Sequence, residues 1–130
     1  MHKINSYNEL IVWQKSVELV TEIYKITDQF PKEGSCGIVK QINQTSVSIP
    51  AKIAEGWGNE NSSAYLTFLK KAQNSVKELE QLIFLTQKLN FMNKNDFMRM
   101  IYKITETNQL LSSIINKLKS KRGSVGPLNN

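Results

Sequence analysis

The sequence contains few of the residues that build disulfides, active sites or β-sheets. Its 130 residues include one cysteine, one histidine and three prolines, and aromatic residues make up 8% of the chain. A single cysteine excludes an internal disulfide and is typical of a protein that stays in a reducing cytoplasm. No apolar run is long enough to cross a membrane, and the polar segment 1–6 does not resemble a signal peptide. We therefore expect one cytoplasmic domain without a membrane segment.

Patterns typical of catalysis and of metal binding are missing as well. The single histidine, His2, lies next to the chain start, so we expect no ordered base beside Cys36 and interpret this thiol as a small packing residue. Glu78 and Glu80 are two residues apart and point to different faces of a helix. The Glu-x-x-His pattern of di-metal bundles and glycine-rich phosphate loops do not occur. We expect no catalytic residue, no metal, no cofactor and no small-molecule substrate.

Apolar residues at helical spacing are what the sequence does contain. They make up 40% of the chain and recur every three or four residues, a period typical of α-helices. The pattern predicts helices over about residues 7–29, 35–57 and 63–89, and a fourth helix capped by Asn93. Helices joined by short loops pack antiparallel. The sequence therefore predicts an all-α, up-down-up-down antiparallel four-helix bundle over residues 1–122, followed by a disordered tail over residues 123–130.

The first predicted helix carries two apolar stripes rather than one. They lie about 120° apart around the helix axis, whereas one bundle interior requires one apolar face. The additional stripe predicts a second buried contact, such as a subunit interface. One stripe consists of Leu10, Trp13, Val17, Val20 and Tyr24, and the other of Val12, Leu19, Ile23, Ile26 and Phe30.

The segment around Pro50 breaks the local rules of its helix. Proline has no N–H to donate to the carbonyl of Ser46, so the helix should bend there while it continues. Small residues on both sides would allow another helix to approach closely. Gly56 and Gly58 predict a left-handed stop at the C-terminal end. We expect a tight helix crossing that ends in a turn.

The same segment carries a resemblance to a known family. Ser48–Ala51 followed by Ile53–Gly56 resembles the SIPxNIAEG signature of the four-helix bundle proteins encoded in 23S rRNA intervening sequences. Leu10–Lys15, Phe30–Glu33 and Glu78–Glu80 are similar to further motifs of that family. The resemblance implies a four-helix bundle. Related accessory proteins of diversity-generating retroelements are basic pentameric bundles, so it also implies a homopentamer that engages nucleic acid.

The surplus of positive charge suggests where nucleic acid would bind. The net charge is +6, and basic proteins favour acidic partners. Most of the surplus lies near the C-terminus, and a charge run at that place also complements the helix dipole. The family often has arginine at positions where this chain has Asn43 or Gln44, and Asn59, which argues against a fully inherited surface. The candidate phosphate contacts are Lys52, Lys70, Lys71, Lys117, Lys119, Lys121 and Arg122.

Two residues of the signature have two interpretations each. Glu55 either orients a ligand or partner, or forms an ion pair with a neighbour such as Lys52. Trp57 either stacks on a nucleobase or closes an interface or the end of the bundle. The signature and interface candidates are Ser48, Ile49, Pro50, Ile53, Glu55, Gly56 and Trp57. The leading hypothesis is a non-catalytic oligomeric bundle that binds RNA or DNA or scaffolds a nucleoprotein complex. The alternative is a protein–protein interaction module without nucleic-acid affinity.

Overall fold

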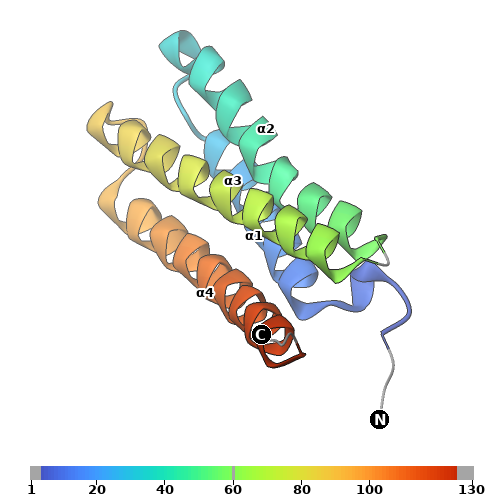
Figure 1. Cartoon of the computed structure of the whole chain (residues 1–130). Helices are drawn as coiled ribbons and strands as arrows, with labels where there is room; N and C mark the ends of the chain where they lie inside the picture. Colours follow the sequence, from blue (N-terminus) through green and yellow to red (C-terminus); the bar gives the residue numbers. More distant parts are fainter. Residues whose placement is uncertain (1–3, 60, 126–130) are drawn as a thin grey trace.

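The protein is an up-down-up-down bundle of four antiparallel helices (Figure 1). The computed structural model describes residues 4–59 and 61–125, and it describes side chains up to Lys121. A short 3-10 turn, η1, precedes the first helix, and no strand occurs in the described part of the chain. The elements are η1 (Tyr7–Glu9), α1 (Ile11–Thr27), α2 (Lys32–Trp57), α3 (Ser62–Lys88) and α4 (Lys94–Val125). The predicted fold class is thus confirmed.

The first helix begins later than the apolar spacing predicts. The side chain of Ser6 caps η1 by accepting a hydrogen bond from the Asn8 N–H. Leu10 then takes extended backbone angles, with φ −73° and ψ 128°, and α1 starts at Ile11. Leu10 therefore does not belong to the α1 stripe, although it packs against the core at the end of the bundle.

The start of α2 contains a kink. Within α2, backbone angles leave the helical region only at Glu33 and Gly34, where φ of Gly34 is +86°. This left-handed position favours glycine and redirects the chain into the long part of the helix. The helix continues through Pro50 as predicted, and its angles there stay helical.

The C-terminal end of α2 differs from the prediction. Gly58 has right-handed angles, with φ −70° and ψ −9°, and among described glycines only Gly34 has a positive φ. The prediction of a left-handed glycine stop at Gly56 or Gly58 is therefore wrong. The side-chain amide of Asn59 instead donates to the carbonyl of Glu55 at 2.9 Å, which satisfies one of the helix-end carbonyls.

Side-chain caps start the last two helices. Asn61 accepts a hydrogen bond from the Ser63 N–H at 2.8 Å, and Asn93 accepts one from the Asp96 N–H at 2.8 Å. The predicted Asn93 cap is thereby confirmed. The last helix extends past Arg122 to Val125, so it includes the first residues of the segment that we expected to be disordered. Residues 126–130 lie outside the described part of the chain.

The bundle interior settles which α1 stripe faces the core. The stripe that starts at Val12 and ends at Phe30 is buried, and it packs against buried residues of the other three helices. Most residues of the other stripe, from Trp13 to Val20, are only partly buried, and Tyr24 is exposed. The polar groups in the interior find partners: Thr45 donates to Glu78 at 2.8 Å and Ser16 donates to a backbone carbonyl at 2.7 Å.

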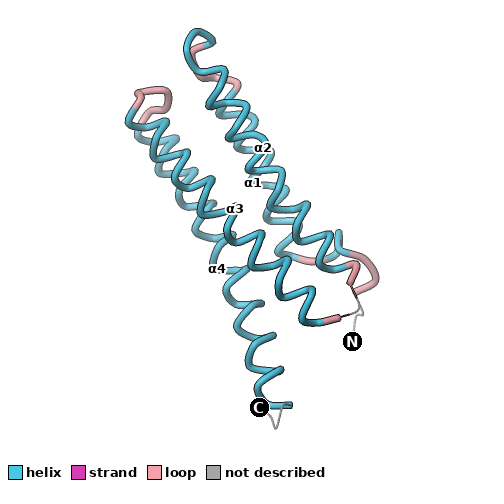
Figure 2. Tube along the Cα trace, turned by 45° about the horizontal axis from the view of Figure 1, so that its top comes forward, coloured by secondary structure: helices cyan, strands magenta, loops and turns pink. Residues whose placement is uncertain are grey.

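The order of the helices around the bundle creates two opposite sides. Helix α1 packs against α2 and α4, and α3 packs against α2 and α4, while α1 and α3 are diagonal. Figure 2 shows the resulting two hairpin-like pairs, α1 with α2 and α3 with α4, lying side by side. The outer surface of the α1/α2 pair therefore faces away from the outer surface of the α3/α4 pair.

Candidate nucleic-acid interface

The signature segment serves mainly to pack the bundle. Ile49 and Ile53 are fully buried in the core. Ser48 is half-buried, and its hydroxyl lies 2.8 Å from that of Ser75 on α3. These contacts account for the predicted small and apolar positions without a ligand.

Gly56 lies where α2 and α3 approach each other closely. A Cβ atom at this position would lie 2.7 Å from Cβ of Phe68 and 3.1 Å from Cδ1 of Tyr65, so no side chain fits without a shift of α3. The ring of the neighbouring Trp57 packs edge-on against Tyr65, with centroids 5.9 Å apart. Burial raises the pKa of the Tyr65 phenol above its usual range. The structure thus places Trp57 at the end of the α2–α3 contact, half-buried.

Glu55 has a structural partner. Its carboxylate lies 3.8 Å from the ammonium of Lys52, one turn earlier on α2. Both side chains are substantially exposed, so this pair adds little to stability. The geometry agrees with the ion-pair interpretation of Glu55. Lys52 is therefore paired with Glu55, and it does not lie with the other candidate cations.

The outer surface of the α3/α4 pair gathers lysines at regular spacing. Lys70, Lys77 and Lys88 are seven and eleven residues apart on α3, close to two and three full helical turns. Lys94 and Lys119 are related in the same way on α4, about seven turns apart. Gln73, next to the α3 row, bonds to Ser112 at 2.7 Å, and Ser112 shares the α4 row, so the two rows lie side by side. We call Lys70, Lys77, Lys88, Lys94 and Lys119 the lysine face.

These lysines form no ion pairs with described residues, unlike Lys15, Lys25, Lys32, Lys52 and Arg99. None of the five ammonium groups lies within 4 Å of a carboxylate among the described side chains, and all five side chains are exposed. On the side formed by α1 and α4, in contrast, Arg99 forms ion pairs with Glu22 and Asp96. The ammonium groups of the lysine face are therefore not held in ion pairs by described carboxylates, and they can contact a polyanion.

The structure brings together only part of the cations that the sequence predicted. Lys70 and Lys119 lie on the lysine face. Lys71 is about 100° away from Lys70 around α3, and its ammonium lies 5.0 Å from the ring centroid of Phe68. Lys117 and Lys121 are exposed, but at about 100° per residue they point away from Lys119. The Arg122 side chain lies outside the described part.

Three lysines of this face, at positions 77, 88 and 94, are absent from the predicted set. The available signal was the spacing of seven and eleven residues along one helix, which places side chains in one row. The sequence analysis looked for cations that are adjacent in sequence, whereas a helix distributes adjacent residues around its circumference. A search by helical period would have found the α3 row.

The outer surface of the α1/α2 pair carries a group of apolar side chains, and exposed Lys40 lies in the same α2 row, seven residues before Val47. Asn43 of α2 lies 3.1 Å from the Thr27 hydroxyl of α1, which fixes how the two helices face each other. Tyr24 and Val47 are 47% and 43% exposed, and the other members are mostly half-buried. We call this set the apolar face: Trp13, Val17, Val20, Tyr24, Val47, Pro50, Ala51 and Ala54.

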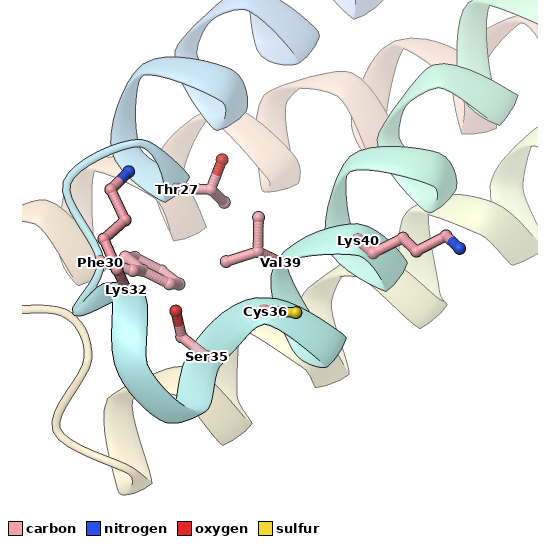
Figure 3. A pocket seen from close by; sticks show the side chains of 7 residues that line it. All are labelled: Thr27, Phe30, Lys32, Ser35, Cys36, Val39 and Lys40. Atoms are coloured by element: carbon pink, nitrogen blue, oxygen red, sulfur yellow. The ribbon is translucent and has the colours of Figure 1, made fainter.

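Cys36 lies in a shallow pocket at one end of the α1/α2 pair. The pocket has a volume of about 240 Å³ and is lined by Phe30, Ser35 and Val39, among others. Figure 3 shows Phe30 and Val39 pointing into it, while Lys40 points away. Cys36 is exposed and is not part of the buried core. Among described residues, no group of three or more histidine, cysteine or acidic side chains could hold a metal ion.

Comparison with known proteins identifies the family. The family model of the 23S rRNA-intervening sequence protein matches residues 8–113. The chain belongs to this family. A crystal structure of a protein with unknown function from the S23 ribosomal protein family, from Bacteroides thetaiotaomicron, is similar, with a TM-score of 0.75 and 25% identity. The similarity covers 81% of this chain and 98% of that one.

These matches confirm the family that the Pro50 signature indicated, and they agree with the bundle fold. No curated protein sequence matches the chain significantly. Among the described helices of this family member, none combines the length and the hydropathy that a membrane-spanning segment requires.

Proposed function

We propose that this member of the 23S rRNA-intervening sequence protein family is a non-catalytic oligomeric bundle that binds the phosphate backbone of nucleic acid through its lysine face. The observation that supports the proposal most is the set of five exposed lysines without carboxylate partners on one side of the bundle. Lysines in a row contact successive phosphates and release condensed counterions, which drives binding without reading sequence.

The apolar face supports self-association as the second part of the proposal. A monomer rarely leaves a contiguous apolar surface of this kind in contact with water. Tyr24 and Val47 are its exposed large members, and Trp13 adds a half-buried aromatic ring about three turns before Tyr24 on α1. The proposed number of five copies comes from the family resemblance. Repetition of the lysine face in each copy would increase the affinity for a long strand by avidity.

A salt titration tests the nucleic-acid part of the proposal. Fluorescence anisotropy of labelled duplex DNA and single-stranded RNA would be recorded with the wild-type protein at several salt concentrations. We expect log affinity to fall linearly with log salt, by about 0.9 per phosphate contact for the duplex and about 0.7 for the single strand. Absence of binding even at low salt would rule out this function.

The apolar face also supports the second candidate, a protein–protein interaction module without nucleic-acid affinity. Pull-down of the tagged protein from its native lysate, with and without nuclease, separates the two candidates. Partners that are lost after nuclease treatment favour the nucleic-acid function. Partners that are retained, together with a negative salt titration, favour the interaction module.

A further inference from the structure

A small hollow lies within the lysine face, between α3 and α4. Its volume is about 150 Å³, and it is lined by Val76, Lys77, Glu80, Ile104, Thr105 and Asn108. Val76 and Ile104 are buried, so they form an apolar floor, and the polar residues form the rim. A flat ring with polar edges would bury its face on such a floor and direct its edge at the rim.

Glu80 is the one acidic residue among those that line this hollow. Of the four carboxylates on α3 and α4, Glu78 accepts from Thr45 of α2, and Asp96 pairs with Arg99. Glu106 is about 120° around α4 from the Lys94–Lys119 row. Glu80 alone lines the hollow beside the lysines. It is half-buried, and no hydrogen bond or ion pair with another described residue engages it.

A carboxylate repels phosphate, so its presence in a phosphate-binding face requires a donor in the ligand. An ionised carboxylate only accepts hydrogen bonds, and its two oxygens accept two parallel N–H groups. Among the four bases, guanine alone presents two adjacent N–H donors on its Watson–Crick edge, followed by the O6 acceptor. Asn108 can serve O6: its side-chain oxygen lies 3.1 Å from the Gln73 amide nitrogen, which leaves its own amide N–H groups as donors.

We infer that this hollow binds an unpaired guanine of a single strand whose phosphates contact the lysine face. Glu80 accepts from N1–H and from the 2-amino group, Asn108 donates to O6, and the ring lies over Val76 and Ile104. Lys77, at the rim, is placed to contact an adjacent phosphate. Unpaired bases in single strands are read on their Watson–Crick edges in this way. The inference rests on the proposed function, because the lysine face supplies the affinity for the strand.

The test compares strands that differ in one base. Short labelled uridine strands would carry guanine, inosine or adenine at the centre, and anisotropy would give their affinities for the wild-type oligomer and for Glu80→Gln. Inosine lacks the 2-amino group. We expect the wild type to prefer guanine over adenine by about fivefold or more, with inosine between them. Glu80→Gln should reduce the guanine-to-adenine ratio to near one, because an amide presents one acceptor and one donor group.

Glu55→Gln is the matched control, because it removes the same charge on α2, away from the lysine face. It should leave the guanine-to-adenine ratio of the wild type unchanged. If Glu80→Gln raised the affinity for all strands by the same factor, Glu80 would only reduce the charge of the face, and the inference would be wrong.

Two further outcomes separate this inference from the function on which it rests. Equal wild-type affinity for the guanine, inosine and adenine strands would overturn the guanine site and leave phosphate binding intact, whereas failure of every strand to bind at low salt would overturn the proposed function. The experiment would be repeated with deoxyribose strands. A preference for ribose that Glu80→Gln removes, without any preference among bases, would assign Glu80 to the 2′-hydroxyl and overturn the guanine assignment.

Discussion

The two outer sides of the bundle have the same helical architecture and opposite chemistry. On the α1/α2 side, most positions that point outward are aromatic, aliphatic or small, and Lys40 at one end of α2 is a charged exception. On the α3/α4 side, the positions that point outward include five lysines without acidic partners. Core packing does not dictate either choice, because outward positions tolerate most polar residues. The difference supports the two separate roles that we propose, self-association and nucleic-acid binding.

The remaining two sides of the bundle make the contrast sharper. Between α1 and α4, charges occur in compensating pairs such as Arg99 with Glu22. Between α2 and α3, Lys52 pairs with Glu55, and Thr45 bonds to Glu78. Paired charges keep a surface hydrated and inert toward ligands of one sign. The predictions below change the apolar face and the lysine face in turn.

The largest effect is expected from removing the charge of the lysine face. Replacing Lys70, Lys77, Lys88, Lys94 and Lys119 together by glutamine should reduce the affinity for duplex DNA by about a hundredfold or more at 0.1 M salt, because each lost phosphate contact also removes its counterion release. The salt slope should become correspondingly shallower. Anisotropy titration at several salt concentrations measures both quantities, and circular dichroism checks that the helices remain.

The control for this variant removes the same charge elsewhere. Lys15, Lys25, Lys32 and Lys52 each lie within 4 Å of a carboxylate, and Lys71 lies over the Phe68 ring. Glutamine at these five positions should change the affinity by much less than the lysine-face variant. Equal losses in the two variants would show that net charge, and not the arrangement on α3 and α4, governs binding.

Introducing charge into the apolar face should dissociate the oligomer. Tyr24→Glu combined with Val47→Glu would place two carboxylates in the proposed interface, where burying an unpaired charge is strongly unfavourable. Light scattering at micromolar concentration should give the 14.9 kDa mass of one chain for this variant and a multiple of it for the wild type. Both side chains are nearly half exposed in the single chain, so the fold should persist.

Two exposed apolar residues of α4 provide the matched control for this experiment. Met98 and Tyr102 are 59% and 69% exposed and lie outside the apolar face. Glutamate at both positions should leave the oligomer intact. If the Met98–Tyr102 variant were monomeric and the Tyr24–Val47 variant stayed oligomeric, the interface would lie on α4. If the wild type were monomeric, self-association through either surface would be excluded.

Gly56 lies at the contact between α2 and α3, the helices that join the two faces. Its replacement should lower the free energy of unfolding. Alanine at this position would bring its Cβ to 2.7 Å from Cβ of Phe68, so α3 must shift. Overpacking of this kind lowers the free energy of unfolding by about 1–3 kcal/mol, although the better helix propensity of alanine offsets up to about 1 kcal/mol. Urea denaturation of Gly56→Ala measures the net effect.

Gly37→Ala is the control, because a Cβ there meets no atom within 4 Å and the residue lies in the same helix. This change should stabilise the protein by about 0.5–1 kcal/mol through helix propensity alone. If both alanine variants were equally stable, close approach of α2 and α3 would not be the reason for glycine at position 56.

The fold followed from the sequence because its signals are local. The apolar period, the Asn93 cap and the Pro50 signature each depend on residues within one helix, and they predicted the four helices and their antiparallel order. The errors concern places where the local rule has an alternative. Gly58 can end a helix with right-handed angles when Asn59 bonds the Glu55 carbonyl, and nothing in the composition distinguishes that end from a left-handed one.

The candidate site was harder to predict from the sequence than the fold, because it spans two helices. The α3 lysines share a row that sequence periodicity alone reveals, but the proximity of Lys94 and Lys119 to that row depends on how α3 and α4 pack. The hollow around Glu80 requires the same information, since Thr105 and Asn108 come from the other helix. Sequence spacing placed Glu78 and Glu80 on different faces of a helix, but it did not show that Glu80 lines a hollow between α3 and α4.

The smallest effect is expected at Pro50, which contributes both to the backbone of α2 and to the apolar face. Pro50→Ala would restore an N–H that can donate to the Ser46 carbonyl, a gain in helix stability. It would also remove the half-buried ring from the surface that we assign to self-association. Because α2 already passes Pro50 with helical angles, the two contributions should nearly cancel, and the free energy of unfolding should change by less than about 1 kcal/mol.

Measuring this change on the Tyr24–Val47 glutamate background separates the two contributions. In that monomeric background the ring has no partner subunit to contact, so Pro50→Ala should be neutral or stabilising in urea denaturation, whereas in the wild-type oligomer it should weaken association at low protein concentration. Ala51→Pro is the control, because it introduces a proline one residue further along the same helix. It removes the N–H that would donate to the Val47 carbonyl, and it should lower the free energy of unfolding by about 3 kcal/mol. If Pro50→Ala destabilised the monomeric background as strongly as Ala51→Pro does, the ring would be required for folding of α2, and its place on the apolar face would no longer be evidence for an interface.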